Sequence, residues 1–233
     1  MSGPAVTLTA NAGAVLEWNG HVLWVDALHD TPVPGFSSVS PALWARMRET
    51  LPPPELLCFT HCHPDHYSPR LAAEALALWP GALPALPRRD FARQLLLSGD
   101  EARLSAGGMT LRFLRLPHEG PGYEDVPLYG LLLFDGTSRV LIAGDCEPAC
   151  PALARHLEGL TVDLAILNFP WLTLRKGRRY LEEILRPKHL FLCHLPFPED
   201  GGSSWLDAAR RAAEASSLPD VRLLTRPLQR ESL

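Results

Sequence analysis

The chain has 233 residues and lacks any long apolar run. None reaches the roughly 18 consecutive apolar residues that suggest a membrane-spanning helix. Its first residues also lack the charged start and apolar core of a secretory signal. We therefore expect a protein that does not associate with a membrane and that resides in the cytoplasm.

Cysteine is scarce, and neither sign of charge dominates. Five cysteines occur, an odd number, so without a secretory signal we expect reduced thiols. Cys146 and Cys150 form a C-x-x-x-C pair, but the second pair that a zinc knuckle would need is absent. A net charge of −4 gives no electrostatic basis for binding nucleic acid. No internal repeat occurs, and the 46% hydrophobic content fits one globular domain over residues 1–233 with a large core.

One short segment concentrates the chemistry of the chain. Thr60 is followed by the pattern H-x-H-x-D-H, which is made by His61, His63, Asp65 and His66. Imidazole nitrogen and carboxylate oxygen suit zinc and neighbouring first-row metals. In an extended loop the first two histidines project to one side and can share an ion, and the next two residues can serve a second ion. Sites rich in histidine and carboxylate usually keep a position open for water.

The flanking residues place this motif on a loop between a strand and a helix. Residues 55–60 form a short apolar run that is typical of a buried strand. Ser68 and Pro69 then give a helix cap and a favoured first helical residue, before a run of strong helix formers. Sites in α/β proteins are common where a strand's carboxyl end meets a helix N-terminus.

The motif resembles that of the metallo-β-lactamase-fold metallo-hydrolase superfamily. Further signatures of that superfamily have candidates in the same order along the chain, so the resemblance spans about Thr7 to His194. The first is an opening hairpin at residues 11–26, which turns at Asn19-Gly20 and ends in Asp26. The others are single residues that follow strands: His118 after the strand 109–116, Asp145 after the strand 140–143, and His194 after a strand from His189.

The resemblance implies two divalent ions, zinc first, with manganese or iron as alternatives. His61, His63 and His118 would hold the first ion. Asp65, His66 and His194 would hold the second, and Asp145 would bridge the two. Asp26 would orient a ligand from behind, and Asp65 would also position the nucleophile or take its proton. Each of these residues follows an apolar, strand-like run, so one sheet edge can gather them.

The function implied is hydrolysis of an ester-type bond in a small molecule, a phosphoester, phosphodiester or lactone, by a hydroxide that bridges the metals. The sequence around His118 lacks the second Gly-His motif that thioester-hydrolysing members carry. The chain therefore resembles more the branch of the ascorbate-phosphate lactonase and ribonuclease Z-like proteins. No substrate arm for transfer RNA occurs, and nucleic acid is not an expected partner. An iron protein handling O₂ and a non-catalytic metal-binding domain are the alternatives. A homo-oligomer is left open, and no organic cofactor is expected.

The fold implied is α+β, a four-layer αββα sandwich. Helices are expected at residues 41–48, 70–78, 90–97, 148–157, 180–185 and 204–215, and later strands at 128–134, 162–167 and 221–224. The basic stretch Arg175–Arg179 is either a phosphate-binding element or the exposed start of a helix. Tyr123, Phe169 and Trp171 either wall a pocket or pack in the core. His29 and Asp30 either line the pocket mouth or form a polar loop.

Overall fold

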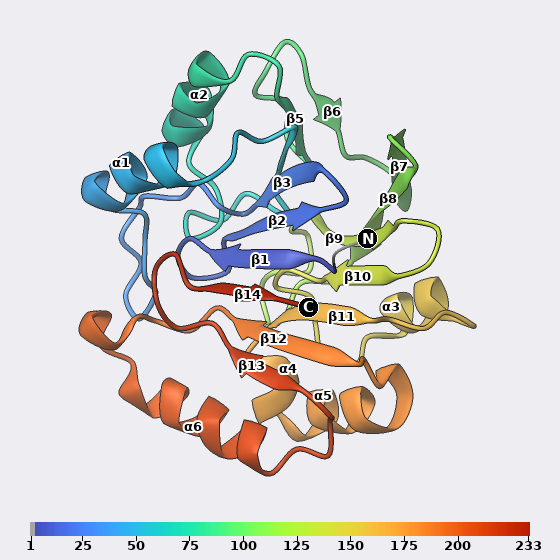
Figure 1. Ribbon diagram of the computed structural model, residues 1–233. Helices are drawn as coiled ribbons and strands as arrows, with labels where there is room; N and C mark the ends of the chain where they lie inside the picture. The colour runs from blue at the N-terminus through green and yellow to red at the C-terminus, as the bar shows by residue number, and fades with distance from the viewer. Residues whose placement is uncertain (1–2) are drawn as a thin grey trace. The chain divides into compact units, whose positions relative to one another are not determined.

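Two seven-stranded sheets organise the chain, each in its own compact unit. The computed structural model describes residues 3–233. Unit 1 is built from residues up to Leu96 together with His194–Ser203 and Leu224–Leu233, and unit 2 from Leu97–Cys193 and Ser204–Leu223. Figure 1 follows the chain through the elements of both units.

The sheet of unit 1 has the order β14-β1-β2-β3-β4-β5-β6. Its strands are β1 (Ala5–Leu8), β2 (Ala14–Trp18), β3 (His21–Val25), β4 (Leu56–Cys58), β5 (Leu83–Leu86), β6 (Leu95–Leu96) and β14 (Arg230–Ser232). The pairs from β14 to β3 are antiparallel, and those from β3 to β6 are parallel. The predicted hairpin joins β2 to β3 through Asn19 and Gly20, which have φ angles of 51° and 84°. Two positive φ angles are what a two-residue type I′ turn requires.

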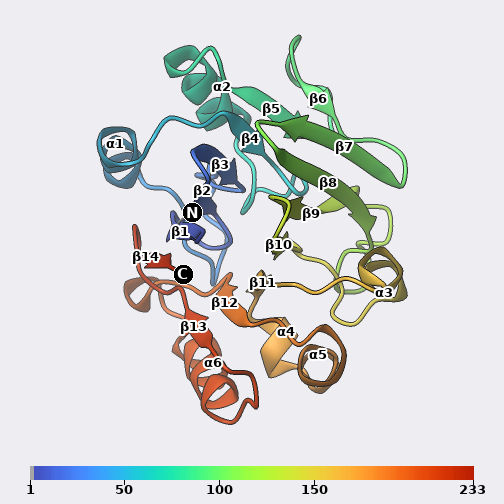
Figure 2. The same ribbon diagram turned by 45° about the vertical axis from the view of Figure 1, so that its right-hand side comes forward.

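Helices α1 (Pro41–Thr50) and α2 (Pro69–Leu78) belong to this sheet's unit and lie close together in Figures 1 and 2. Each begins with a serine cap and a proline, as predicted for α2. Trp24 of β3 meets Trp44 of α1 and Trp79 at the end of α2, with ring centroids 6.4 and 5.1 Å apart and edges turned to faces. This aromatic cluster anchors both helices, because edge-to-face packing of large rings adds to the gain from their burial.

The sheet of unit 2 has the order β13-β12-β11-β10-β9-β8-β7. Its strands are β7 (Glu101–Ala106), β8 (Met109–Leu116), β9 (Leu128–Phe134), β10 (Arg139–Ile142), β11 (Leu164–Asn168), β12 (His189–Cys193) and β13 (Val221–Leu223). The pairs from β7 to β10 are antiparallel, and those from β10 to β13 are parallel. The carboxyl ends of β10, β11 and β12 therefore lie at one edge of this sheet.

Helices of unit 2 pack on this sheet through a continuous apolar core. They are α3 (Pro151–Leu157), α4 (Pro170–Thr173), α5 (Arg175–Tyr180), a π-helical turn η1 (Leu181–Leu185) and α6 (Ser203–Glu214). Leu141, Leu167 and Leu192 of the sheet share this core with Leu153 of α3 and Leu181 of η1. Figure 2 shows α3, α5 and α6 along the same side of the parallel strands. The other short helix, η2 (Pro198–Asp200), belongs to unit 1.

Some predicted elements differ from the structure. The helix predicted at residues 90–97 is wrong, because Leu95 and Leu96 pair with β5 and the Gln94 side chain accepts hydrogen bonds from the backbone N–H groups of Asp90 and Phe91. A helix this short is marginal, so strand pairing outweighs local propensity. The helix expected from residue 180 is the π-helical η1, and α3 begins only after residue 150. Strands β1, β5, β7 and β14 were not individually predicted.

None of the helices in residues 3–233 has both the length and the apolar composition needed to cross a bilayer.

Candidate metal centre

The loop after β4 is held by a buried carboxylate from the end of β3. Asp26 is 1% exposed, and its Oδ1 accepts a hydrogen bond from the backbone N–H of Thr60 at 2.7 Å. Its Oδ2 accepts from the Thr60 hydroxyl at 2.6 Å and lies 2.9 Å from Nδ1 of His66. The Nδ1 atom of His66 therefore carries the proton, which turns the lone pair of Nε2 toward any ligand. The role expected for Asp26, to orient a ligand, stays a prediction, and the contact with His66 is the one through which it would act.

Three of the predicted ligands converge within unit 1. The Nε2 atoms of His66 and His194 lie 3.2 Å apart. Asp65 Oδ2 lies 3.8 Å from the first of these nitrogens and 3.4 Å from the second. Two nitrogens bound at about 2.05 Å to a tetrahedral zinc ion would be about 3.3 Å apart. The Asp65–His66–His194 group therefore fits a metal ion, both in its donor chemistry and in its spacing.

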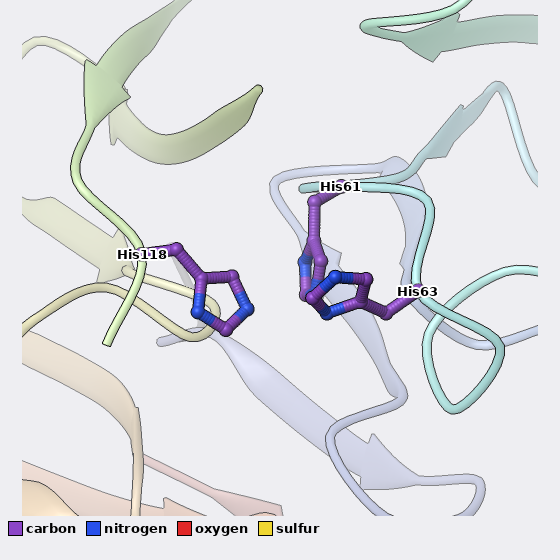
Figure 3. Close-up of side chains that lie close together, drawn as sticks. All are labelled: His61, His63 and His118. Atoms are coloured by element: carbon purple, nitrogen blue, oxygen red, sulfur yellow. The ribbon is translucent and has the colours of Figure 1, made fainter. Parts of the chain in front are cut away.

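His61 and His63 lie on the same loop with their rings edge to face. Their ring centroids are 4.6 Å apart, and the rings are shown in Figure 3, which also draws His118 from the segment after β8. Nδ1 of His61 is 3.1 Å from the Thr60 hydroxyl oxygen. Because that hydroxyl donates to Asp26, its oxygen is the acceptor, and the proton of His61 is on Nδ1. His61 thus presents Nε2 as the ligand atom, as His66 does.

His29 lies entirely in the interior of unit 1. Its Nε2–H donates to the carbonyl oxygen of Ala10 at 3.1 Å. Burial lowers the pKa of His29 to about 4, so the ring is neutral at physiological pH. Asp30 instead forms a surface ion pair with Arg70. His29 is 0% exposed and braces a turn, so it does not line a pocket mouth, whereas Asp30 is part of the polar surface.

In unit 2, the two predicted ligands His118 and Asp145 lie close together. His118 follows β8 and Asp145 follows β10, and His118 Nε2 lies 3.7 Å from Asp145 Oδ2. A backbone bridge between His118 and Cys146, with Glu119 N–H donating to Asp145 O at 2.8 Å, ties the two loops together. His118 Nδ1–H donates to the Glu119 carbonyl oxygen at 2.7 Å, so Nε2 is again the ligand atom.

Sequence reasoning missed Asn168 as a site residue. Asn168 ends β11 and is 5% exposed, and its Nδ2 donates a hydrogen bond to Asp145 Oδ1. That bond fixes the rotation of the carboxylate and turns Oδ2 toward His118. The one signal in the sequence is that Asn168 closes an apolar run as Asp145 does. The parallel pairing of β10 and β11, which brings the two residues together, is a long-range feature.

The two cysteines beside Asp145 are buried and close together. The sulfur atoms of Cys146 and Cys150 are 3.5 Å apart, and Cys150 caps α3 by accepting from the Leu153 N–H. The hydrogen bond between the thiols lowers the pKa of Cys150 to about 7 and raises that of Cys146. None of the five cysteines takes part in a disulfide bond.

The other residues singled out by sequence have mixed outcomes. The basic stretch lies in helix α5, where Arg175, Lys176 and Arg179 are exposed. Lys176 pairs with Glu147 and Arg179 with Glu183, at 2.9 Å each. Trp171 is 1% exposed and belongs to the core, so the pocket-wall alternative is wrong for this residue. Tyr123 is 45% exposed, with its ring centroid 4.8 Å from that of His118.

Comparison with solved structures gives matches along the whole chain, although no family model and no curated protein matches it. A metallo-β-lactamase fold protein, YhfI from Bacillus subtilis, is 16% identical with a TM-score of 0.67, and all of both chains is covered. Igni18, a metallo hydrolase from the archaeon Ignicoccus hospitalis, is 16% identical with a TM-score of 0.69, over 100% of this chain and 99% of that one. CmlA, a diiron β-hydroxylase from Streptomyces venezuelae, is 15% identical with a TM-score of 0.62, over 100% of this chain and 54% of that one.

The matches to YhfI and Igni18 cover all of this chain, and so the residues of both units. The expected α+β class agrees with the two mixed sheets and their flanking helices. The chain therefore has the metallo-β-lactamase fold.

Proposed function

We propose that the protein is a metal-dependent hydrolase that acts on an ester-type bond of a small molecule. The observation that carries the proposal is the spacing of the Asp65–His66–His194 group, which suits a bound ion. The similarity to a metallo hydrolase over the whole chain supports the same conclusion.

We further propose a dinuclear centre. His61, His63 and His118 would hold one ion. Asp65, His66, Asp145 and His194 would hold the other, and Asp145 would be shared between them. Zinc is the first candidate, since its preferred ligands include imidazole and carboxylate, and manganese and iron accept the same set.

Two divalent ions, when bound, supply Lewis acidity and lower the pKa of water to about 7. The protein's own groups would orient the ligands and move the proton. Thr60 and Asp26 hold His61 and His66 with Nε2 available, and Asn168 holds Asp145. We assign proton transfer from the attacking water to Oδ1 of Asp65, because Oδ2 is the atom that accepts the Asn11 amide hydrogen bond.

Aromatic side chains support a substrate with an apolar substituent. Tyr123 lies against His118, and Phe169, the residue after Asn168, stacks on Trp205 with ring centroids 5.7 Å apart. A flat apolar group gains from contact with such rings. We therefore expect aryl phosphoesters and lactones with apolar side groups to be better substrates than small sugar phosphates.

A second candidate is an iron protein that activates O₂. The similarity to a diiron β-hydroxylase favours it, although this chain spans about half of that protein's length. Metal content measured on protein purified without chelators separates the candidates. Two equivalents of zinc or manganese with turnover of an aryl phosphodiester support the hydrolase, and iron with O₂ consumption supports the alternative. Bound metal without turnover of any ester would indicate a non-catalytic domain.

The Asp145→Ala variant tests the shared ligand directly. We expect its metal content to fall to one ion or none and its turnover to be lost, because removal of the carboxylate takes a donor from both ions. His21→Ala is the control, since that histidine pairs with Glu55 at the surface hairpin. Two bound ions and full activity in Asp145→Ala would refute the dinuclear assignment.

A further inference from the structure

Asn11 occupies a buried turn between β1 and β2. Its side chain is 0% exposed, and its φ of 51° lies in the left-handed region that asparagine tolerates better than most residues. The turn is closed by backbone bonds from Gly13 N–H to Ala10 O at 2.7 Å and from Thr9 N–H to Gly13 O at 2.8 Å. A third hydrogen bond of this turn comes from the ring of His29, which donates to Ala10 O. The backbone of Asn11 is therefore fixed from both sides.

From this position Asn11 contacts two of the candidate ligands. Its Nδ2 donates to the carbonyl oxygen of Asp65 at 3.1 Å and to the Asp65 carboxylate oxygen Oδ2 at 3.3 Å. The backbone carbonyl oxygen of Asn11 accepts a hydrogen bond from the backbone N–H of His194 at 2.9 Å. Asp65 and His194 come from separate stretches of the chain, and Asn11 links both within unit 1.

The chemistry of the contact suits a ligand to a cation. A carboxylate that binds an ion needs a fixed rotation, and a hydrogen bond to one of its oxygens supplies this. An amide donates that bond without carrying positive charge, whereas lysine or arginine at this place would repel the ion. His194 also has a positive φ, 61°, so its backbone needs a partner that holds it in this strained conformation.

We propose that Asn11 is a positioning residue for the second ion. Its side-chain amide holds the Asp65 carboxylate, and its backbone carbonyl oxygen holds His194. The inference rests on the proposed function, because it concerns the ion bound by the Asp65–His66–His194 group. Nothing in the H-x-H-x-D-H motif predicts this residue, which lies 54 positions before Asp65.

The Asn11→Gly variant separates the side chain from the backbone. Glycine accepts a positive φ and keeps the carbonyl that His194 uses, so only the amide contact with Asp65 is lost. We expect titration with Co²⁺, followed by visible absorption, to show the first ion bound as in the wild type. The dissociation constant of the second ion should rise by about 10- to 100-fold. Competition with Zn²⁺ should give the same difference.

Asn19→Gly is the matched control. Asn19 has the same φ of 51° but lies at the exposed tip of the β2–β3 hairpin, so this variant makes the same chemical change away from the ligands. Its two dissociation constants should equal those of the wild type. If Asn11→Gly fails to fold by circular dichroism, Asn11→Asp keeps the size and the left-handed preference while losing the amide donor. Its second Co²⁺ titration step should then differ from the wild type in affinity or spectrum.

The outcomes are distinct for the two proposals. A wild-type protein that takes up two ions, with unchanged second-ion binding in Asn11→Gly or Asn11→Asp, would overturn the role of Asn11 and leave the metal-dependent function standing. A wild-type protein that takes up no Co²⁺ or Zn²⁺ would overturn both.

Discussion

Asp26 accepts hydrogen bonds from the Thr60 backbone, the Thr60 hydroxyl and His66 while remaining almost fully buried. The Asp26→Asn variant replaces one accepting oxygen by a donor, so one of these three groups loses its partner. We expect the free energy of unfolding to fall by about 1–3 kcal/mol. Zinc affinity should fall by about 10- to 100-fold.

Thermal unfolding and competitive zinc titration measure these two effects. The control is Asp30→Asn, because that carboxylate forms an exposed ion pair with Arg70. Surface pairs of this kind contribute little to stability. Equal results for the two variants would mean that Asp26 has no special part in holding the loop.

His29 makes the stability of the metal-free protein depend on pH. Burial lowers its pKa from 6.5 to about 4, so between these values the unfolded chain binds a proton that the folded chain does not. Stability contributed by the neutral ring is fully present above about pH 6.5 and is lost as the pH falls toward 4. The loss amounts to about 3 kcal/mol at most.

The His29→Gln variant should reduce this slope. Its amide places a donor near the position of the imidazole Nε2, so the bond to Ala10 O can persist without a titrating group. We expect the melting temperature of the variant to fall less between pH 6.5 and 4.5 than that of the wild type, both measured in chelator. Parallel curves would assign the pH dependence to other groups.

At the level of an element, the turn that carries Asn11 is tightly packed around Gly13. A Cβ atom at Gly13 would lie 2.8 Å from the Asp26 carbonyl oxygen and 2.9 Å from Ala27 Cα, both backbone atoms that cannot swing away. We expect Gly13→Ala to lower the free energy of unfolding by about 1–3 kcal/mol. It should also weaken zinc binding, because the strain falls on Asp26.

Gly81→Ala is the matched control for this change. A Cβ atom there would have nothing within 4 Å. Chemical denaturation of both variants checks the prediction. A Gly13→Ala protein as stable as Gly81→Ala would show that the β1–β2 turn can shift without cost.

The metal motif could be predicted because it is local. His61, His63, Asp65 and His66 lie within six residues, and the strand and the capped helix on either side carry their own signals. Asn11 and Asn168 could not be assigned in this way. The amide of each one donates to a residue 54 or 23 positions away, and a single amide carries no periodicity.

The same limit explains the elements that were missed. Strand β14 has three residues, and it exists because it pairs with β1 at the far end of the chain. The segment 90–97 has helix-forming residues, yet Leu95 and Leu96 form β6 and pair with β5. Where long-range pairing decides the outcome, local composition does not.

At the scale of the whole molecule, the C-terminal residues complete the sheet of unit 1. Backbone bonds join Leu228 and Gln229 to Leu8, and Leu233 to Pro4. Deletion of residues 228–233 should lower the free energy of unfolding by about 2–4 kcal/mol from these three bonds. It should also promote aggregation, because β1 becomes an exposed edge strand.

Thermal unfolding and light scattering test the deletion. The control is Arg230→Gln, which removes the ion pair with Glu17 but keeps the strand. An equal effect in both proteins would assign the role of this segment to its charge rather than to its pairing.

The division of the chain into units has a consequence for how such a protein can change over generations. Unit 1 is assembled from three separate stretches and unit 2 from two, so neither corresponds to one continuous piece of the gene. A recombination event that copies a single segment would carry an incomplete sheet: residues 97–193, for example, would lack both β13 and α6. Inheritance of the fold therefore favours duplication or fusion of the entire coding sequence over exchange of its halves.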